Sequence, residues 1–122
     1  MENKEKMFRI RSKIWIEDDQ GNVVFGLGRF RILSAIEQCG SINGAAKELK
    51  MGYRAIWGKI KTTEDALGQP LLVRSTGGSS GGGSELTPLA KSLLKRFRMI
   101  HGQVNHKADA FFDDTFAPTL HL

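Results

Sequence analysis

Residues 41–60 read SINGAAKELKMGYRAIWGKI, and within them one short amphipathic pattern is followed closely by another. Ser41 is a natural N-cap, and the apolar residues after it recur at i, i+3, i+4 and i+7, so a helix is expected directly after it. Met51-Gly52 ends that helix after little more than two turns. The second pattern predicts a helix over about 53–67, whose apolar stripe comprises Ile56, Ile60, Thr63 and Leu67. Two short helices joined by a tight turn predict a helix-turn-helix, although many helical cores contain such a corner.

The segments that follow favour the winged form of this motif. Residues 71–73 form a short apolar strand that ends at Arg74, and residues 76–84 are almost entirely Gly and Ser. A second strand-like segment, 85–87, completes the pattern, so we expect a wing over 71–87. The composition alone also permits a flexible linker between domains. A phosphate-binding loop is excluded, because the tract contains no lysine.

The segments before the motif predict a β-hairpin and one more helix. Residues 8–25 alternate apolar and polar side chains on either side of the turn sequence DDQGN, which is typical of a hairpin. Residues 29–39 have apolar side chains at helical spacing, and Gly40 follows them as a C′ stop. Three helices are therefore expected over 29–67.

A long helix is expected after the wing. Thr87-Pro88 is a strong start signal, because threonine serves as N-cap and proline fits the first helical position. Apolar residues then recur in steps of three and four, the spacing of two packed helices. We predict that this seam is uncovered in one subunit and forms a homodimer interface with these residues: Leu89, Leu93, Phe97, Ile100, Val104 and Phe111. Residues 88–112 are the expected dimerisation helix, and 113–122 a frayed tail.

The composition indicates a single domain with a basic middle. The chain has 122 residues, of which 40% are hydrophobic and 25% charged, and a formal net charge of +5. Residues 41–100 hold ten Lys or Arg against four Asp or Glu, which favours a polyanionic partner. Charges interrupt every apolar run, so neither a membrane-spanning helix nor a secretory signal is expected. We expect one domain over 1–112, located in the cytoplasm.

Residues with catalytic or metal-binding chemistry form no recognisable site. Cys39 is the single cysteine, which excludes an internal disulfide, and it is interpreted as a buried free thiol. His101 and His106 are five residues apart and lack a third ligand. Asp113-Asp114 lies in the expected tail. We therefore expect neither an enzyme nor a cofactor or metal site.

Several motifs together resemble a known family. The segments AAKEL (45–49), ALGQPLLVR (66–74) and ELTPLA (85–90) are similar to the DNA-binding segment of LysR-type regulators. The segments GSI (40–42) and YRAIW (53–57), with the glycine runs after Thr76, resemble more closely ModE, the molybdate-responsive regulators. This resemblance, over about residues 28–100, implies an α+β winged helix-turn-helix with an N-terminal β-hairpin and a long C-terminal dimerisation helix.

The resemblance also implies a set of DNA-facing residues: Ser41, Tyr53, Arg54, Trp57, Lys61, Arg74, and Ser79 and Ser80 at the wing tip. Arg54 can bond a guanine edge or a phosphate, Lys61 suits a phosphate, and Tyr53 suits the sugar–phosphate backbone. For Trp57, a thymine-methyl contact and a core position both stay open. Gly58 departs from the pattern, because a polar side chain on the outer face of the second helix would read bases better.

The implied function is that of a sequence-specific, DNA-binding transcriptional regulator of the ModE-like type, which binds double-stranded DNA as a homodimer. The chain stops where a full ModE continues into molybdate-binding domains, so we expect this chain not to bind molybdate. One alternative is a winged helix that serves as a protein-interaction module without reading DNA; salt-dependent duplex binding distinguishes the two. An oxyanion-binding protein is a third interpretation, but the sequence shows no internal anion pocket.

Overall fold

The computed structural model describes residues 8–75 and 83–120. Residues Trp15–Phe97 form one compact unit, and the described residues on either side of them form a second. The single domain over 1–112 that the sequence predicts stays a prediction. Within the described ranges, no helix is both long enough and apolar enough to cross a membrane.

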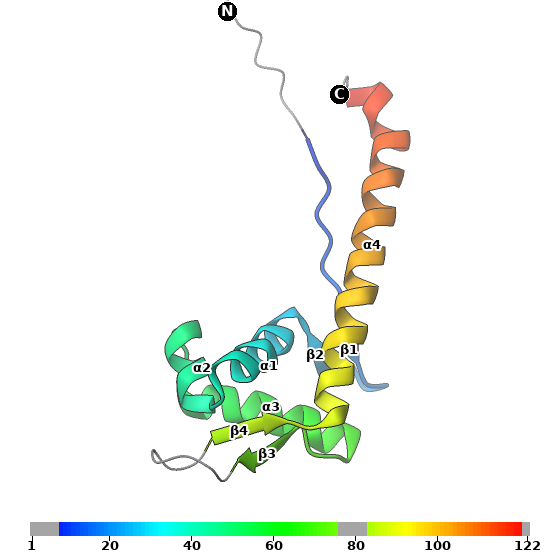
Figure 1. Cartoon of the computed structure of the whole chain (residues 1–122). Helices are drawn as coiled ribbons and strands as arrows, with labels where there is room; N and C mark the ends of the chain where they lie inside the picture. The colour runs from blue at the N-terminus through cyan, green and yellow to red at the C-terminus, as the bar shows by residue number, and fades with distance from the viewer. Residues whose placement is uncertain (1–7, 76–82, 121–122) are drawn as a thin grey trace, which may run out of the picture. The chain divides into compact units, whose positions relative to one another are not determined.

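Three helices make up the centre of the larger unit: α1 (Leu27–Cys39), α2 (Ile42–Leu49) and α3 (Tyr53–Leu67). All three pack against one another (Figure 1). Helix α1 begins two residues earlier than the predicted 29, so that Leu27 and Gly28 belong to its first turn. The helix-turn-helix expected from the sequence is therefore present as α2 and α3.

Local signals end and begin these helices where the sequence predicts, with one exception. Gly40 ends α1 with a φ of 76°, a left-handed conformation that favours glycine. Ser41 caps α2, because its Oγ accepts a hydrogen bond from the N–H of Gly44 at 2.9 Å. The end of α2 was expected at Met51-Gly52, but the left-handed residue is Lys50, with a φ of 55°.

The wing is a two-stranded antiparallel hairpin of β3 (Leu72–Ser75) and β4 (Gly83–Leu86). Because the two strands pair, the Gly/Ser tract joins the two halves of one hairpin, and the alternative of a linker between domains is wrong. The first strand starts one residue later than predicted: Leu71 is buried, and its N–H donates to Glu64 Oε2 at 2.8 Å. The tip, 76–82, lies outside the described residues, and with it Ser79 and Ser80.

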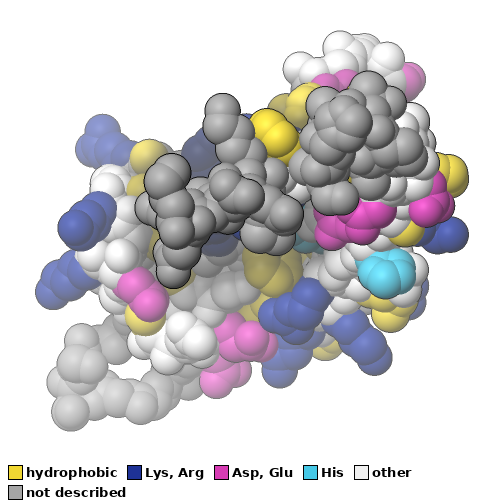
Figure 2. Space-filling model, turned by 90° about the horizontal axis from the view of Figure 1, so that it is seen from above, with side chains coloured by type: hydrophobic (Ala, Val, Ile, Leu, Met, Phe, Trp, Pro, Cys, Tyr) yellow, Lys and Arg dark blue, Asp and Glu magenta, His cyan; other side chains and the backbone are white. Residues whose placement is uncertain are grey.

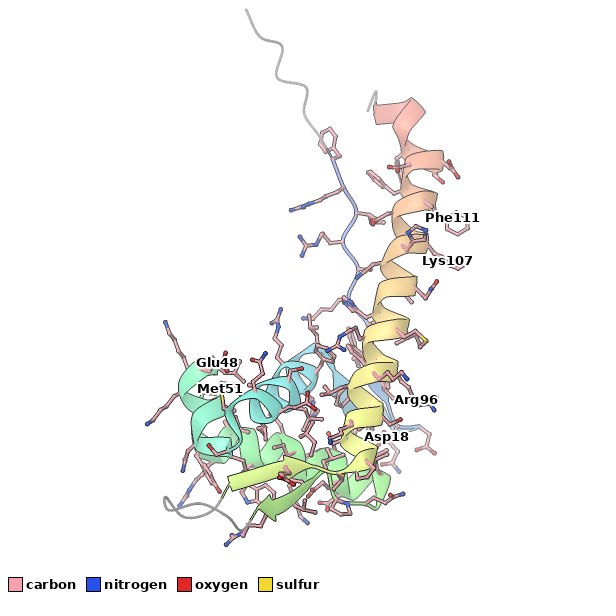
Figure 3. The ribbon with its side chains drawn as sticks, viewed as in Figure 1. Asp18, Glu48, Met51, Arg96, Lys107 and Phe111 are labelled. Atoms are coloured by element: carbon pink, nitrogen blue, oxygen red, sulfur yellow. The ribbon has the colours of Figure 1, made fainter. Side chains whose placement is uncertain are left out.

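A second hairpin precedes α1, but it is shorter than the predicted 8–25. It consists of β1 (Trp15–Glu17) and β2 (Val23–Gly26), and Trp15 pairs with Gly26. Helix α1 starts directly after Gly26, so residues 8–14 have no partner strand, and the prediction that they extend the hairpin is wrong. Asp18 (labelled in Figure 3) organises the turn. Hydrogen bonds to its carboxylate, chiefly from Asn22, lower the pKa of this group.

The core of the larger unit is apolar and includes the first turns of α4 (Pro88–Leu120). Its buried side chains are Val24, Phe25, Ile32, Leu33, Ala35, Ile36, Ala45, Ile56, Ile60, Leu71, Leu86, Ala90, Leu94 and Phe97. Phe97 is 3% exposed, and its ring centroid lies 5.3 Å from that of Phe25 and 5.8 Å from that of Phe30. The expectation that Phe97 lies uncovered in one subunit is therefore wrong.

The smaller unit consists of residues 8–14 and the remainder of α4. Ser12 Oγ donates to Asn105 Oδ1, which ties the N-terminal segment to the helix. Helix α4 continues to Leu120, so the prediction of a tail from residue 113 is wrong for 113–120. The rings of Phe112 and Phe116, at i and i+4, lie in contact with centroids 5.4 Å apart and support these added turns. None of the described side chains in this unit is fully buried.

Candidate nucleic-acid interface

Helix α3 has one buried and one exposed face. Ile56, Ile60 and Thr63 are buried, and the Thr63 hydroxyl donates to the Val24 carbonyl at 2.6 Å. Leu67 was expected on the same stripe, but it is 36% exposed at the end of the helix. The opposite face consists of exposed residues at i, i+3, i+4 and i+7: Arg54, Trp57, Gly58 and Lys61.

Trp57 belongs to the surface and not to the core. Its side chain is 44% exposed, which decides the question that the sequence left open. On the same face, Lys61 Nζ lies 3.3 Å from Asp65 Oδ1, with both side chains more than half exposed. An exposed pair of this kind is worth little, so Lys61 can exchange Asp65 for a phosphate.

A shallow pocket lies where the start of α2, the start of α3 and the wing meet. Its volume is about 240 Å3, and it is lined by Ser41, Ile42, Asn43, Tyr53, Arg74, Gly83 and Ser84. A backbone hydrogen bond of 2.8 Å from Ser84 N–H to the Gly40 carbonyl ties the wing to this corner. The lining contains one cation and no carboxylate, and the positive end of the α2 dipole adjoins it. Such a pocket suits an oxyanion such as a phosphate group.

The pocket brings together three of the predicted DNA-facing residues, Ser41, Tyr53 and Arg74, from three different elements. The other described candidates lie on the exposed face of α3 and do not line the pocket. Asn43 and Ser84 also line the pocket, although the sequence did not predict them. Asn43 carries a usable signal, because it stands in the first turn after the Ser41 cap. Ser84 carries none, since its place depends on how the two wing strands pair.

The turn between α1 and α2 is closely packed. A Cβ added at Gly44 would lie 2.8 Å from the Cβ of Cys39 and 3.1 Å from Ser41 Oγ. Cys39 is exposed, so its interpretation as a buried thiol is wrong. Its Sγ donates to Glu48 Oε2 at 3.2 Å (Glu48 is labelled in Figure 3), and this hydrogen bond raises the pKa of the thiol. The close approach explains why glycine occupies position 44.

Two glycine substitutions should shift stability in opposite directions. Gly44→Ala is expected to lower the free energy of unfolding by about 1–3 kcal/mol, because the new methyl overlaps Cys39. Gly58→Ala should raise it by about 0.5–1 kcal/mol, because a Cβ there meets nothing within 4 Å and alanine favours the helix. Urea unfolding at one fixed protein concentration measures both. A neutral Gly44→Ala would contradict the close packing of this turn.

Residues 27–91 match the family of bacterial regulatory helix-turn-helix proteins, lysR family. The chain belongs to this family. The matched segment contains α1, α2, α3, the wing and the start of α4, and so includes every residue of the pocket and of the exposed α3 face.

Individual relatives to which this lysR-family chain is similar include ModE proteins. The transcriptional regulator ModE of Haemophilus influenzae is 38% identical over 87 residues, which are 71% of this chain and 34% of that protein. The molybdenum transport protein ModE of Azotobacter vinelandii is 36% identical over 92 residues, 75% of this chain and 34% of that protein. The chain thus spans about a third of the length of these relatives.

A solved structure agrees with the assignment to the lysR family, since CbnR is itself described as a LysR family transcriptional regulator. The crystal structure of the CbnR_DBD–DNA complex resembles the present chain with a TM-score of 0.54 and 26% sequence identity. The match covers 68% of this chain and 90% of that one. It supports the winged helix-turn-helix fold expected from the sequence.

Proposed function

We propose that this chain binds double-stranded DNA sequence-specifically, as the DNA-reading part of a transcriptional regulator in the cytoplasm. The observation that carries the proposal is the pocket of Ser41, Tyr53 and Arg74 beside the exposed face of α3. It combines a phosphate-sized, cationic recess with an adjoining helix face that is free to enter a major groove. The similarity to a chain solved as a DNA complex supports the same function.

Each group has a distinct role in this proposal. The pocket receives a backbone phosphate, with Arg74 supplying the charge and Ser41 and Tyr53 the hydroxyl groups. This contact fixes the register of the protein on the duplex but reads no sequence. Arg54, in the first turn of α3, reads a guanine edge, since the N-terminal part of a recognition helix reaches the base edges. Lys61, two turns further on, contacts a phosphate.

Substitutions at these positions should separate base reading from phosphate binding. Arg54→Ala is expected to weaken binding to the cognate duplex by about 1–3 kcal/mol more than binding to random DNA. Lys61→Ala and Arg74→Ala should weaken both about equally and each reduce the slope of log K against log salt by about 0.9. Fluorescence anisotropy with labelled duplexes, after selection of bound genomic fragments, measures all three.

The matched control is Lys91→Ala, which removes an exposed cation from α4 and should leave both affinity and salt slope unchanged. If the wild-type chain binds no duplex even at low salt, the DNA proposal fails, and a winged helix that binds another protein takes its place.

We also propose that the chain is a homodimer held by the seam of α4. Ile100 and Phe111 are 53% and 70% exposed, and Leu89, Leu93 and Val104 are half-buried. Figure 3 shows Phe111 directed away from the helix into solvent. An apolar row of this kind along a helix marks an interface, and a second copy of α4 offers the matching spacing. Phe97 is excluded from this surface by its burial.

Molybdate should bind this chain weakly and without selectivity over sulfate. A tetrahedral dianion needs several converging donors in an enclosed site, whereas the pocket at α2 is shallow and has one cation, Arg74. Titration calorimetry with molybdate, tungstate and sulfate measures this. One saturable, molybdate-selective site of micromolar affinity would contradict the expectation.

A further inference from the structure

Gly58 is the least expected residue on the exposed face of α3. It stands inside a 15-residue helix, where glycine is less favourable than alanine because it loses more backbone freedom on folding. The packing of the chain does not require it, since a Cβ built at this position would meet none of the described atoms within 4 Å. The structure therefore gives no internal reason for glycine here, and the space in front of it is open to a partner.

The groups directly beside this space are an indole and a backbone carbonyl that already accepts a hydrogen bond. Trp57, the preceding residue, presents an indole that is 44% exposed. The Gly58 carbonyl accepts a hydrogen bond from Thr62 Oγ1 at 2.9 Å, so the nearest backbone acceptor is satisfied. Arg54 and Lys61 stand about one turn to either side of Gly58 on the same face, and Lys61 Nζ lies 3.3 Å from Asp65 Oδ1. Since the proposed function already assigns these two cations to a guanine edge and a phosphate, the indole surface beside Gly58 is left for a non-polar group.

We propose that Trp57 and Gly58 together receive the 5-methyl group of a thymine. The indole contacts the methyl group, and the absence of a side chain at Gly58 leaves the space that the methyl group occupies. The inference rests on the proposed DNA binding, because it assigns one base contact to the same helix face. The thymine methyl is the apolar group that a base pair displays in the major groove. Gly58 thus favours thymine at one position of the operator because it leaves space for the methyl group. This base contact explains why the helix retains a glycine that lowers its stability.

Deoxyuridine tests the contact directly, because it pairs as thymidine does and lacks that methyl group. In the operator selected by the wild-type chain, each thymine is replaced in turn and the affinity measured by anisotropy. We expect one thymine per half-site whose replacement weakens wild-type binding about three- to fivefold, the size of one buried methyl. Trp57→Ala should bind the thymine and uracil duplexes equally. A scan without a sensitive position overturns the proposal, whereas failure to select any operator overturns the proposed function itself.

Gly58→Ala supplies a second, independent test. The melting temperature of this variant should rise. Its affinity for the operator should nevertheless fall about fivefold, because the added methyl group fills the space that the thymine methyl group needs. The matched control is Gly102→Ala, another helical glycine whose Cβ position is open; it should raise the melting temperature without loss of affinity. Unchanged operator affinity in Gly58→Ala, or an equal loss in Gly102→Ala, overturns the proposal.

Discussion

Replacement of Phe97 by alanine is expected to lower the free energy of unfolding by about 3–5 kcal/mol, a large share of the stability of a domain of this size. The ring is 3% exposed and lies between Phe25 and Phe30, edge-on to the first with an interplanar angle of 76°. Its removal leaves a cavity where α4 joins the winged helix, because neighbouring aromatic rings can fill little of the space. Urea unfolding followed by circular dichroism measures the loss.

Trp57→Ala is the control for this experiment, since it removes a still larger aromatic side chain from a surface position. With 44% of the side chain exposed, the change in stability should stay within about 1 kcal/mol. Equal losses in the two variants would contradict the assignment of Phe97 to the core and of Trp57 to the surface.

The parts of the fold that the sequence predicted correctly depend on short-range signals. Ser41, Gly40 and Thr87 each end or begin a helix through a hydrogen bond or a backbone angle that involves residues at most four positions away. Such signals can be read from neighbouring residues alone, so the helix-turn-helix and the start of α4 were found within a residue or two.

The incorrect predictions concern segments whose structure depends on contacts with residues far away in the sequence. The apolar steps along α4 predict one seam, but the buried stripe of its first turns is Ala90, Leu94 and Phe97, one position from the predicted Leu89 and Leu93. Phe97 belongs to both stripes, and the sequence does not show whether the core of the same subunit or a second subunit covers it. The alternation before β1 similarly predicts a strand, yet no strand is available to pair with it beyond Gly26.

In the candidate site too, the sequence predicts individual residues but not the long-range contacts that bring them together. The resemblance to a family supplied Ser41, Tyr53 and Arg74, whereas their meeting in one pocket depends on the contact between α2, α3 and the wing. Basic side chains stand on the surface among acidic ones in Figure 2, so charge alone does not mark the site. The site is marked instead by one arginine beside the start of α2, in a pocket whose lining contains no carboxylate.

The double variant Ile100→Asp, Phe111→Asp is expected to weaken the dimer at least about 100-fold, because each subunit would place two carboxylates in an apolar contact. The two positions are 11 residues apart, which is close to three full turns, so both lie on the same face of α4. Sedimentation equilibrium at micromolar concentration should show a dimer for the wild type and a monomer for the variant. If the proposed dimer binds two half-sites about 34 Å apart, as helix-turn-helix dimers do, loss of dimerisation should also reduce affinity for a two-half-site operator to that for a single half-site.

The control shifts each substitution by one residue. Met99 and Ala110 are exposed on α4, and each lies about 100° around the helix from its neighbour on the seam. Met99→Asp, Ala110→Asp therefore adds the same charge to the same helix, away from the proposed contact, and should leave the dimer intact. Circular dichroism should show both variants folded, since none of the four side chains is buried in one subunit. Equal dissociation in the two variants would show that charge on α4, and not the seam, controls assembly, and a monomeric wild type at micromolar concentration would refute the interface altogether.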